Sequence, residues 1–370
     1  MNRPLDLLIS NSRASYYVGG TEVVSLHQAK GLARLGHHVT YVVRKVDTPS
    51  EYFQEFTDSI RREQLPIHIG EVATNAPYGD GHSWAIWNQE AAAFGIAAQD
   101  TYREAIANGA DASVTHMSAD SLYIPDTAPH IVHLHGSPKQ TDPLIDVSMT
   151  RPDAGVAHST SIEEWWHGNY PDLPMHTFRN GVPIETFYHP VDAERPIDIL
   201  YVGRFLEHKG IQDILQAATP DQHIVIAGGG SYQPHIEALI RERGLQAEIV
   251  ERPDNEQLAL LYKHSKIFAC PSRAKEGVLT TMLEAAAAGC AVVTSHGSGM
   301  SDAARHDQNS KLIVPGDVPA LTLSFTQLLE DSTKRQQLAG VFQQEICDKW
   351  SWETKAKELE AIYETVLSSY

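Results

Sequence analysis

The feature that most constrains this chain is the alternation of short apolar runs with helical patterns, which recurs in both halves. Such alternation predicts parallel β-strands joined by crossover helices. In the first half we expect strands over residues 5–10, 39–44, 113–116, 131–135, 155–158 and 176–178, and helices over 22–35 and 89–108. In the second half we expect strands over 197–202, 223–227, 248–251 and 267–270, and helices over 210–218, 234–243, 256–263 and 280–288. The expected fold class is α/β, with two Rossmann-like domains.

A polar stretch punctuated by Pro183, Pro190 and Pro196 separates the two halves and reads as a linker. A length of 370 residues also favours two domains. We therefore expect one domain over residues 1–185 and a second over 186–350. Apolar residues at three-to-four-residue spacing predict a terminal helix over 351–370.

The formal net charge of −18 repels phosphate backbones and anionic lipids, so nucleic acid is not expected as a partner. No apolar run reaches the length of about 18 residues that a transmembrane helix needs. A basic amphipathic helix for docking to a bilayer is also missing, so membrane association is not expected. Three cysteines without metal or disulfide spacing indicate a reducing compartment, and we expect a cytoplasmic protein.

Paired glycines, Gly19 and Gly20, stand directly after the first expected strand and before a helix. Glycines there let backbone amides approach a phosphate at the helix N-terminus. The alternative is a tight turn that needs a positive φ. The pattern alone does not separate the two readings.

Arg204 and Lys209 lie on one loop after the first strand of the second half, close to Gly203. Ligands of open parallel sheets bind at the carboxyl ends of the strands, and a diphosphate needs two or more positive groups. We therefore interpret this cationic pair as a diphosphate site. The alternative is solvated surface charge.

Two glutamates, Glu276 and Glu284, stand eight residues apart, one in a loop and one inside the following helix. Glu276 can accept hydrogen bonds from sugar hydroxyls, and Glu284 can hold ribose hydroxyls. The free amides of the intervening helix tip would face a phosphate; they belong to Leu279, Thr280 and Thr281. The alternative is an ordinary helix N-terminus with acids favourably placed near its dipole.

His133 and His135 share one face of an expected strand. A zinc site needs three or four ligands, and no nearby acid completes one, so no metal is expected. We interpret His135 as a cleft residue at the end of the strand. His133 fits better as a hydrogen-bonded core histidine.

These motifs together resemble the GT-B fold glycosyltransferases, specifically the large retaining family 4 group, over nearly the whole chain. Residues 180–182 and the closing segment 350–353 add to the resemblance. It implies two Rossmann-like domains with parallel sheets facing across a cleft, the first on the acceptor side and the second binding the nucleotide sugar. The terminal helix would pack back on the first domain.

The resemblance also implies roles for single residues. Gly20, beside Gly19, would donate its amide near the donor diphosphate, while Arg204 and Lys209 would neutralise it. His135 would contact the donor sugar near its anomeric centre. Glu276 would bind the transferred sugar and Glu284 the ribose, and the base would rest on backbone around Arg252 and Pro253. The family's common Phe-Gly is replaced by Val278-Leu279, which should leave amide donation intact.

The implied activity is retaining, metal-independent hexosyl transfer from a nucleotide diphosphate sugar, with UDP favoured over GDP, to a hydroxyl of a small-molecule or saccharide acceptor. No cofactor is expected. Acceptor contacts would come from loops over residues 16–18, 78–84 and 139–142. Two alternatives stay open, a sugar-nucleotide epimerase or hydrolase on the same fold, and a catalytically silent nucleotide-sugar-binding subunit.

Overall fold

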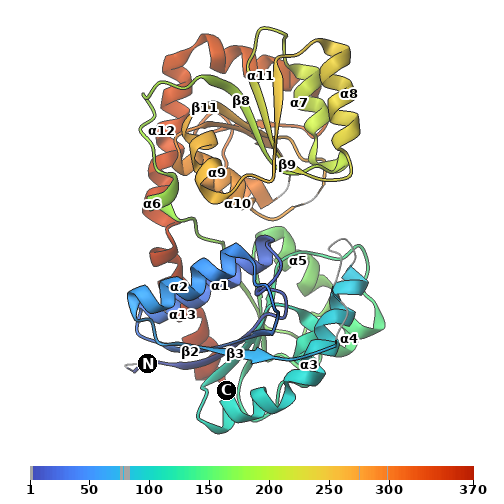
Figure 1. Cartoon of the computed structure of the whole chain (residues 1–370), viewed down its shortest axis with the longest axis vertical. Coiled ribbons are helices and arrows are strands. Elements are labelled where there is room, and N and C mark those ends of the chain that lie inside the picture. The colour runs from blue at the N-terminus through green and yellow to red at the C-terminus, as the bar shows by residue number, and fades with distance from the viewer. Residues whose placement is uncertain (1–2, 76–77, 79–83, 275, 298) are drawn as a thin grey trace. The chain divides into compact units, whose positions relative to one another are not determined.

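The structure is a computed structural model that describes residues 3–75, 78, 84–274, 276–297 and 299–370. The chain divides into two compact units (Figure 1). The first unit comprises residues 1–180 together with 352–370, and the second comprises residues 181–351. The sequence-based boundaries lay at 185/186 and 350/351. Each unit is described below by itself.

The first unit is built on a parallel sheet of seven strands in the order β3-β2-β1-β4-β5-β6-β7. The strands are β1 (Asp6–Ser10), β2 (His38–Arg44), β3 (Ile67–Val72), β4 (Ala112–Thr115), β5 (His130–Leu134), β6 (Ala154–Ala157) and β7 (Met175–Thr177). Its helices are α1 (Gly20–Arg34), α2 (Glu51–Glu63), α3 (Trp84–Ala107), α4 (Pro143–Ser148), α5 (Thr160–Asn169) and α13 (Trp352–Ser369), with a 3₁₀ segment η1 (Ser118–Tyr123).

Both faces of this sheet are covered, because successive residues of its strands enter different cores. Leu7 and Ile9 of β1 pack with residues of α1, α2 and α13, whereas Leu8 packs with residues of α3. Helix α13 thus completes the core of a unit whose other elements end at residue 180. Gly36, which follows α1, has a φ of 97°, as expected for a glycine that ends a helix.

The second unit is built on a parallel sheet of six strands in the order β10-β9-β8-β11-β12-β13. The strands are β8 (Ile197–Arg204), β9 (Ile224–Gly229), β10 (Ala247–Glu251), β11 (Ser265–Cys270), β12 (Ala291–Ser295) and β13 (Lys311–Ile313). The helices are α6 (Ile184–Phe187), α7 (Ile211–Ala217), α8 (Gln233–Arg243), α9 (Asn255–Lys263), α10 (Thr280–Ala287), α11 (Val318–Glu330) and α12 (Ser332–Lys349), with 3₁₀ segments η2 (Glu207–Lys209) and η3 (Gly299–Asp302).

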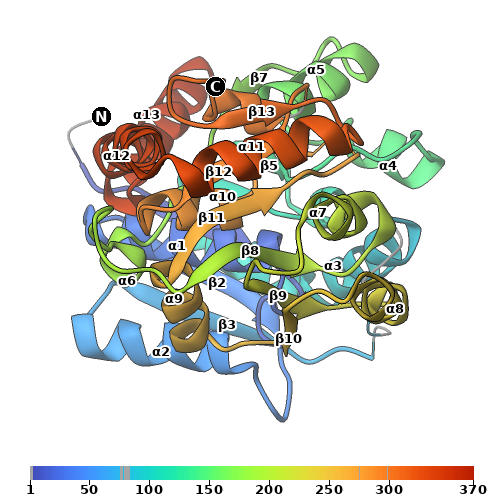
Figure 2. The same cartoon turned by 90° about the horizontal axis from the view of Figure 1, so that it is seen from above.

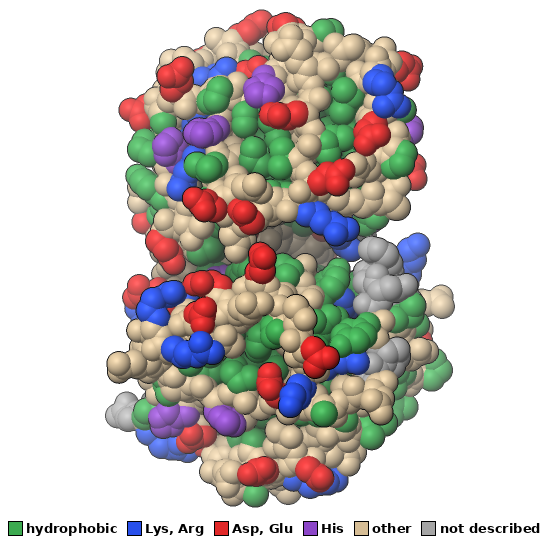
Figure 3. Space-filling view, viewed as in Figure 1, with side chains coloured by type: hydrophobic (Ala, Val, Ile, Leu, Met, Phe, Trp, Pro, Cys, Tyr) green, Lys and Arg blue, Asp and Glu red, His purple; other side chains and the backbone are tan. Residues whose placement is uncertain are grey.

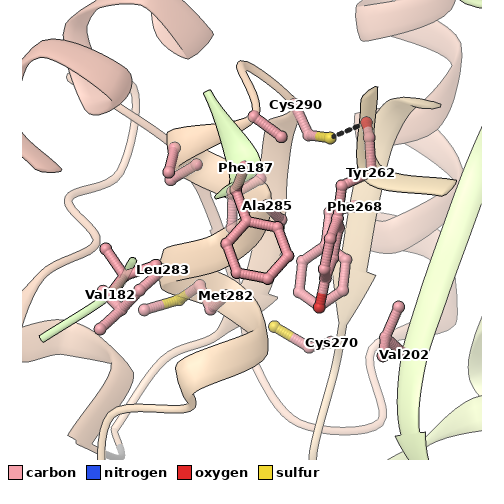
Figure 4. Packing of buried hydrophobic residues seen from close by; sticks show 14 of the residues in the cluster. Val182, Phe187, Val202, Tyr262, Phe268, Cys270, Met282, Leu283, Ala285 and Cys290 are labelled. Carbon is pink, nitrogen blue, oxygen red and sulfur yellow. Dashed lines mark hydrogen bonds between the residues drawn. The ribbon is translucent and has the colours of Figure 1, made fainter. Parts of the chain in front are cut away.

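Helices cover both faces of this sheet as well (Figure 2). Ile199 and Tyr201 of β8 pack with residues of α7, α8 and α11, whereas Leu200 and Val202 pack with residues of α9 and α10. Figure 4 shows the second of these cores, in which the Cys290 thiol donates to the backbone oxygen of Tyr262 at 3.1 Å.

The strands and helices expected from the sequence are confirmed, with ends shifted by a few residues. Among the strands, β3, β12 and β13 were not anticipated. Of the helices, α2, α4, α5, α6, α11 and α12 were missed. The described part of the chain contains no helix that is both long and apolar enough to cross a membrane.

Each sheet reverses its strand order at one point, between β1 and β4 in the first unit and between β8 and β11 in the second. Open α/β sheets bind ligands beyond the carboxyl ends of the strands at such a point. The loops that follow β1 and β8 carry the glycine pair and the cationic pair.

Charged side chains of both signs are scattered over the displayed face of each unit (Figure 3).

Candidate functional site

The carboxyl end of β8 presents a cation that has no partner among the described residues. Arg204, the last residue of β8, is exposed, and its guanidinium forms no hydrogen bond or ion pair with the described residues. Its backbone oxygen accepts a hydrogen bond from the Tyr201 hydroxyl at 3.0 Å. At Gly203, which has a φ of 155°, a Cβ would lie 2.9 Å from that hydroxyl. Gly203 therefore permits this turn, which leaves Arg204 free to bind an anion.

Lys209 and Glu276 form an ion pair with each other. Lys209 lies on η2 after β8, Glu276 lies in the loop after β11, and both side chains are largely buried, with 12% and 15% of their surface exposed. The second carboxylate oxygen of Glu276 accepts a hydrogen bond from the Ser272 hydroxyl. The sequence assigned the two residues to different parts of a donor. The structure brings them together at the reversal point of the sheet, where Glu276 neutralises Lys209.

Helix α10 begins four residues after Glu276, and its N-terminus is not capped by a side chain. Leu279 is the N-cap residue, and Leu279, Thr280 and Thr281 are all partly exposed. The first amides of an α-helix lack partners within the helix, so this tip can donate to an anion. The amide of Gly299 donates to the backbone oxygen of Glu276 at 2.6 Å, which fixes the loop that leads into α10.

Glu284 lies inside α10 and is partly buried. Burial raises the pKa of Glu284 from its ordinary value of 4.5 to about 7, although the hydrogen bond from Tyr262 acts in the opposite direction. The Tyr262 hydroxyl donates to Oε2 of Glu284 at 2.8 Å. No hydrogen bond from a described residue reaches Oε1, so this oxygen can accept one from a ligand hydroxyl.

Gly228, near the end of β9, and Gly230, directly after it, allow the neighbouring backbone segments to approach closely. A Cβ on Gly228 would lie 1.9 Å from the backbone oxygen of Gly203, and one on Gly230 would lie 2.4 Å from that of Phe205. Arg252, with a φ of 46°, follows β10, and its amide donates to the Gly228 oxygen at 3.0 Å. Pro253 is partly exposed. Arg252 and Pro253, the segment expected to contact the nucleobase, are thus hydrogen-bonded through Arg252 to the glycine that packs against Gly203.

In the first unit, Gly19 and Gly20 lead into α1, but neither has a positive φ. The alternative interpretation, a tight turn that needs a positive φ at these glycines, is therefore wrong. A Cβ on Gly19 would lie 2.6 Å from Oε2 of Glu22 and 2.7 Å from Cε1 of Tyr17, so close packing excludes a side chain there. A Cβ on Gly20 would meet nothing within 4 Å, which leaves its backbone open to approach.

Histidines from three neighbouring strands meet at the same end of this sheet. Because Asn180 Oδ1 can only accept, His158 Nδ1 donates to it at 2.6 Å, and His158 Nε2 accepts from Nδ1 of His133 at 3.0 Å. Nε2 of His133 then accepts from the Tyr363 hydroxyl at 2.8 Å. Burial lowers the pKa of His158 to about 4 and that of His133 well below the ordinary value. His133 is thus a neutral, hydrogen-bonded core histidine.

His135 directly follows β5 and is partly exposed. Its Nε2 lies 2.9 Å from Nδ1 of His116, and its ring stacks on that of His158 with centroids 4.0 Å apart. No described residue forms a hydrogen bond with its Nδ1, which can therefore contact a ligand. Burial lowers the pKa of His135 well below its usual range, so the ring is neutral.

His116, His133 and His135 have ring nitrogens within 4.8 Å of one another, a spacing that a metal ion could use. The sequence analysis overlooked His116, which follows β4. Both nitrogens of His133 are occupied by His158 and Tyr363, so a metal would have to break one of these hydrogen bonds.

Sequence reasoning also missed Ser272 and Tyr262, which position Glu276 and Glu284. Polar residues that act through a contact 22 positions away, as Tyr262 does, leave no local signal. Of the loops expected to contact an acceptor, residues 79–83 lie outside the described residues.

A family model described as "Glycosyl transferases group 1" matches residues 187–340, most of the second unit. The chain carries a group 1 glycosyltransferase domain. This domain contains β8, β11 and α10, and therefore the cationic pair and both glutamates.

Curated relatives include further glycosyltransferases. An uncharacterised glycosyltransferase of Methanocaldococcus jannaschii is 28% identical over 176 residues, which cover 46% of this chain and 45% of the relative. Glycogen synthase of Mycobacterium tuberculosis is 30% identical over 237 residues, 61% of this chain and 54% of the relative. The chain thus spans about half the length of the curated relatives it matches.

Solved structures resemble this chain over nearly its whole length. Sucrose-phosphate synthase from Thermosynechococcus elongatus has a TM-score of 0.78 at 18% identity, with 100% of both chains covered. The Anabaena protein HepE, in complex with UDP and glucose, has a TM-score of 0.75 at 16% identity, covering 98% of this chain and 100% of its own. This likeness confirms the expected GT-B fold.

Proposed function

We propose that this protein is a retaining glycosyltransferase of family 4. It transfers a sugar from a nucleotide diphosphate sugar, UDP-linked in preference to GDP-linked, to a hydroxyl of a small-molecule or saccharide acceptor. The observation that carries this proposal is the combination of Arg204 and the Lys209–Glu276 pair at the reversal point of the second unit's sheet.

The leaving group explains why these residues suit the reaction. When the anomeric C–O bond to the diphosphate breaks, negative charge grows on the diphosphate, and fixed positive groups stabilise it. Arg204 is free to do so, and the α10 amides add partial positive charge. Lys209 would exchange part of its contact with Glu276 for the phosphate. That exchange would free Glu276 to accept hydrogen bonds from hydroxyls of the transferred sugar.

The acceptor oxygen then attacks the anomeric carbon from the face that the diphosphate leaves, and its proton passes to a donor phosphate oxygen. The products are the glycoside and the nucleoside diphosphate. Because the charge is neutralised by Arg204 and Lys209, we propose that no metal ion takes part. His135 of the first unit stays a candidate contact to the donor sugar, because no described residue forms a hydrogen bond with its Nδ1.

The comparisons support the donor class. HepE is solved with UDP, with UDP and glucose, and with UDP-glucose, and a trehalose-6-phosphate protein of E. coli is solved with UDP-2-fluoro glucose. A mannosyltransferase relative from Mycolicibacterium smegmatis is GDP-mannose-dependent, so GDP stays an alternative.

The test compares wild type with Arg204→Ala and Lys209→Ala. Nucleoside diphosphate release would be measured with UDP-glucose, UDP-galactose and GDP-mannose against a panel of sugars and sugar phosphates. We expect each variant to lose at least roughly 100-fold in rate, the scale for removing one stabilising group from a transition state. Arg241→Ala, an exposed arginine on α8, is the matched control and should keep the wild-type rate.

Three outcomes contradict the proposal. Wild-type turnover by either variant with the same sugar nucleotide would remove the role of the cationic pair. Release of nucleotide at an undiminished rate without acceptor would indicate a hydrolase. Tight donor binding without turnover on any acceptor would indicate a silent binding subunit.

A further inference from the structure

Arg13 is a buried cation without a hydrogen-bond partner in the first unit. It lies in the loop that follows β1, next to the point where the sheet reverses its order. Only 2% of its surface is exposed, and its guanidinium forms no hydrogen bond with any described residue. Both Nε and Nη2 are fully buried. An unsatisfied buried charge is costly, and in a chain with a net charge of −18 a carboxylate partner was available in abundance.

The nearest carboxylate does not satisfy Arg13. Oε1 of Glu22 lies 3.6 Å from Nε of Arg13, which is beyond hydrogen-bond distance. Burial raises the pKa of Glu22 to about 7, against the lowering effect of Arg13, so near neutral pH this carboxyl is ionised in only part of the molecules. Glu90 is occupied elsewhere, since it accepts from the Tyr16 hydroxyl.

Trp87, whose ring contacts Arg13, and Asn88, which follows Trp87 in α3, offer further donors. Its guanidinium carbon lies 4.1 Å from the ring centroid of Tyr17 and 5.2 Å from that of Trp87. The indole nitrogen of Trp87 is buried and has no acceptor among the residues that the structure describes. Asn88, the next residue of α3, uses Oδ1 to accept from Ser118, while its buried Nδ2 has no acceptor. Four nitrogen atoms on three residues therefore carry protons that no described residue accepts.

A set of donors without acceptors selects a ligand group that only accepts. A phosphate monoester fits this requirement, because it has three terminal oxygens, a charge near −2 and no need to donate. The adjoining loop ends in Gly20, whose exposed backbone begins the 15-residue helix α1 without a side-chain cap. Its partial positive charge favours the same kind of ligand.

We propose that Arg13, Trp87 and Asn88 bind a phosphate group carried by the acceptor. This inference rests on the proposed function, which it deepens by naming the acceptor class as a phosphorylated sugar or polyol. Arg13 is the charge-pairing residue of the site, and the aromatic rings of Tyr17 and Trp87 hold its guanidinium in place.

The first experiment is a calorimetric titration with inorganic phosphate. Because phosphate can also bind Arg204 and Lys209, the titration uses the full chain with Arg204→Ala and Lys209→Ala as background. Adding Arg13→Gln should raise the Kd at least tenfold, and adding Trp87→Phe should raise it several-fold. Arg103→Gln, an exposed arginine of α3, is the control and should leave the Kd unchanged.

Absence of phosphate binding in the background protein, or an unchanged Kd with Arg13→Gln, would overturn the proposal. If Arg13→Gln fails to fold, Trp87→Phe decides, because it removes the indole N–H while keeping an aromatic ring beside Arg13. An unchanged Kd in Trp87→Phe would then count against the site.

The second experiment separates a phosphorylated acceptor from free phosphate. Glucose 6-phosphate should bind at least tenfold more tightly than glucose and more tightly than inorganic phosphate, with both advantages lost in Arg13→Gln. Equal affinity for glucose 6-phosphate and inorganic phosphate would overturn the assignment to an acceptor. Titration of the unmodified chain with UDP tests the proposed function separately, because that measurement reports on the second unit.

Discussion

Replacing Glu284 by glutamine should stabilise the fold at alkaline pH while weakening nucleotide binding. Burial raises the pKa of this carboxyl from 4.5 to about 7. A raised carboxyl pKa means that the folded chain holds the proton more tightly than the unfolded chain. The free energy of unfolding therefore falls as pH rises from about 4.5 to 7, and it stays low above that range.

The size of the effect follows from the two pKa values. A difference of 2.5 units between 4.5 and about 7 corresponds to about 3 kcal/mol at full ionisation, at 1.36 kcal/mol per unit. Roughly 2.5 kcal/mol of this is lost between pH 5 and pH 8. The neutral amide of Glu284→Gln does not titrate, and it can still accept the hydrogen bond from Tyr262. The variant should thus gain about 2.5 kcal/mol over wild type between these pH values.

Urea unfolding of both proteins at pH 5 and pH 8 measures this difference, and comparison with wild type cancels other titrating groups such as Glu22. Glu242→Gln, an exposed glutamate on α8, should show no pH-dependent change. The reasoning is refuted if Glu284→Gln shifts the unfolding free energy equally at both pH values. UDP affinity should fall about tenfold, because an amide oxygen accepts more weakly than a carboxylate.

Three further substitutions test the packing. Tyr363→Phe leaves Nε2 of His133 without its donor and should cost about 1–2 kcal/mol in urea unfolding. Gly228→Ala places a Cβ 1.9 Å from the Gly203 oxygen at a φ of 140°. The substitution should lower the free energy of unfolding by at least about 2 kcal/mol and should weaken UDP binding. A wild-type unfolding temperature and UDP affinity in calorimetry would contradict this. Arg195→Met removes a buried guanidinium that donates to four backbone oxygens, so thermal unfolding should report a loss of roughly 3–5 kcal/mol.

The apolar runs predicted the central strands because these strands are buried on both faces. The edge strand β3 was missed, since its residues are half-exposed and include His68, Gly70 and Glu71. The missed β12 is fully buried, and its short apolar run directly follows the glycine that ends α10. Helix α2 has apolar residues at helical spacing, Phe53, Phe56 and Ile60, after the N-cap Ser50, so its signal was present in the sequence and was overlooked.

The candidate site was predictable where residues lie close together in the chain, as with Arg204 and Lys209 on one loop. The pairing of Lys209 with Glu276 was not, because it joins residues 67 positions apart. His116 and Arg13 escaped notice for a related reason. A lone histidine or arginine carries no motif, and only the fold shows that His116 joins a cluster and that Arg13 is buried without a hydrogen bond from its Nε or Nη2 to a described residue.

The first unit takes its final helix from the far end of the chain, and this has a consequence for folding during synthesis. Trp352, Leu359, Tyr363 and Val366 belong to the same core as α1 and the β1 strand. When the ribosome has made residues 1–180, that core still lacks the side chains of α13. The core can be completed only after all 171 residues of 181–351 have been translated. The second unit, although it comes later in the chain, can therefore reach its native state first.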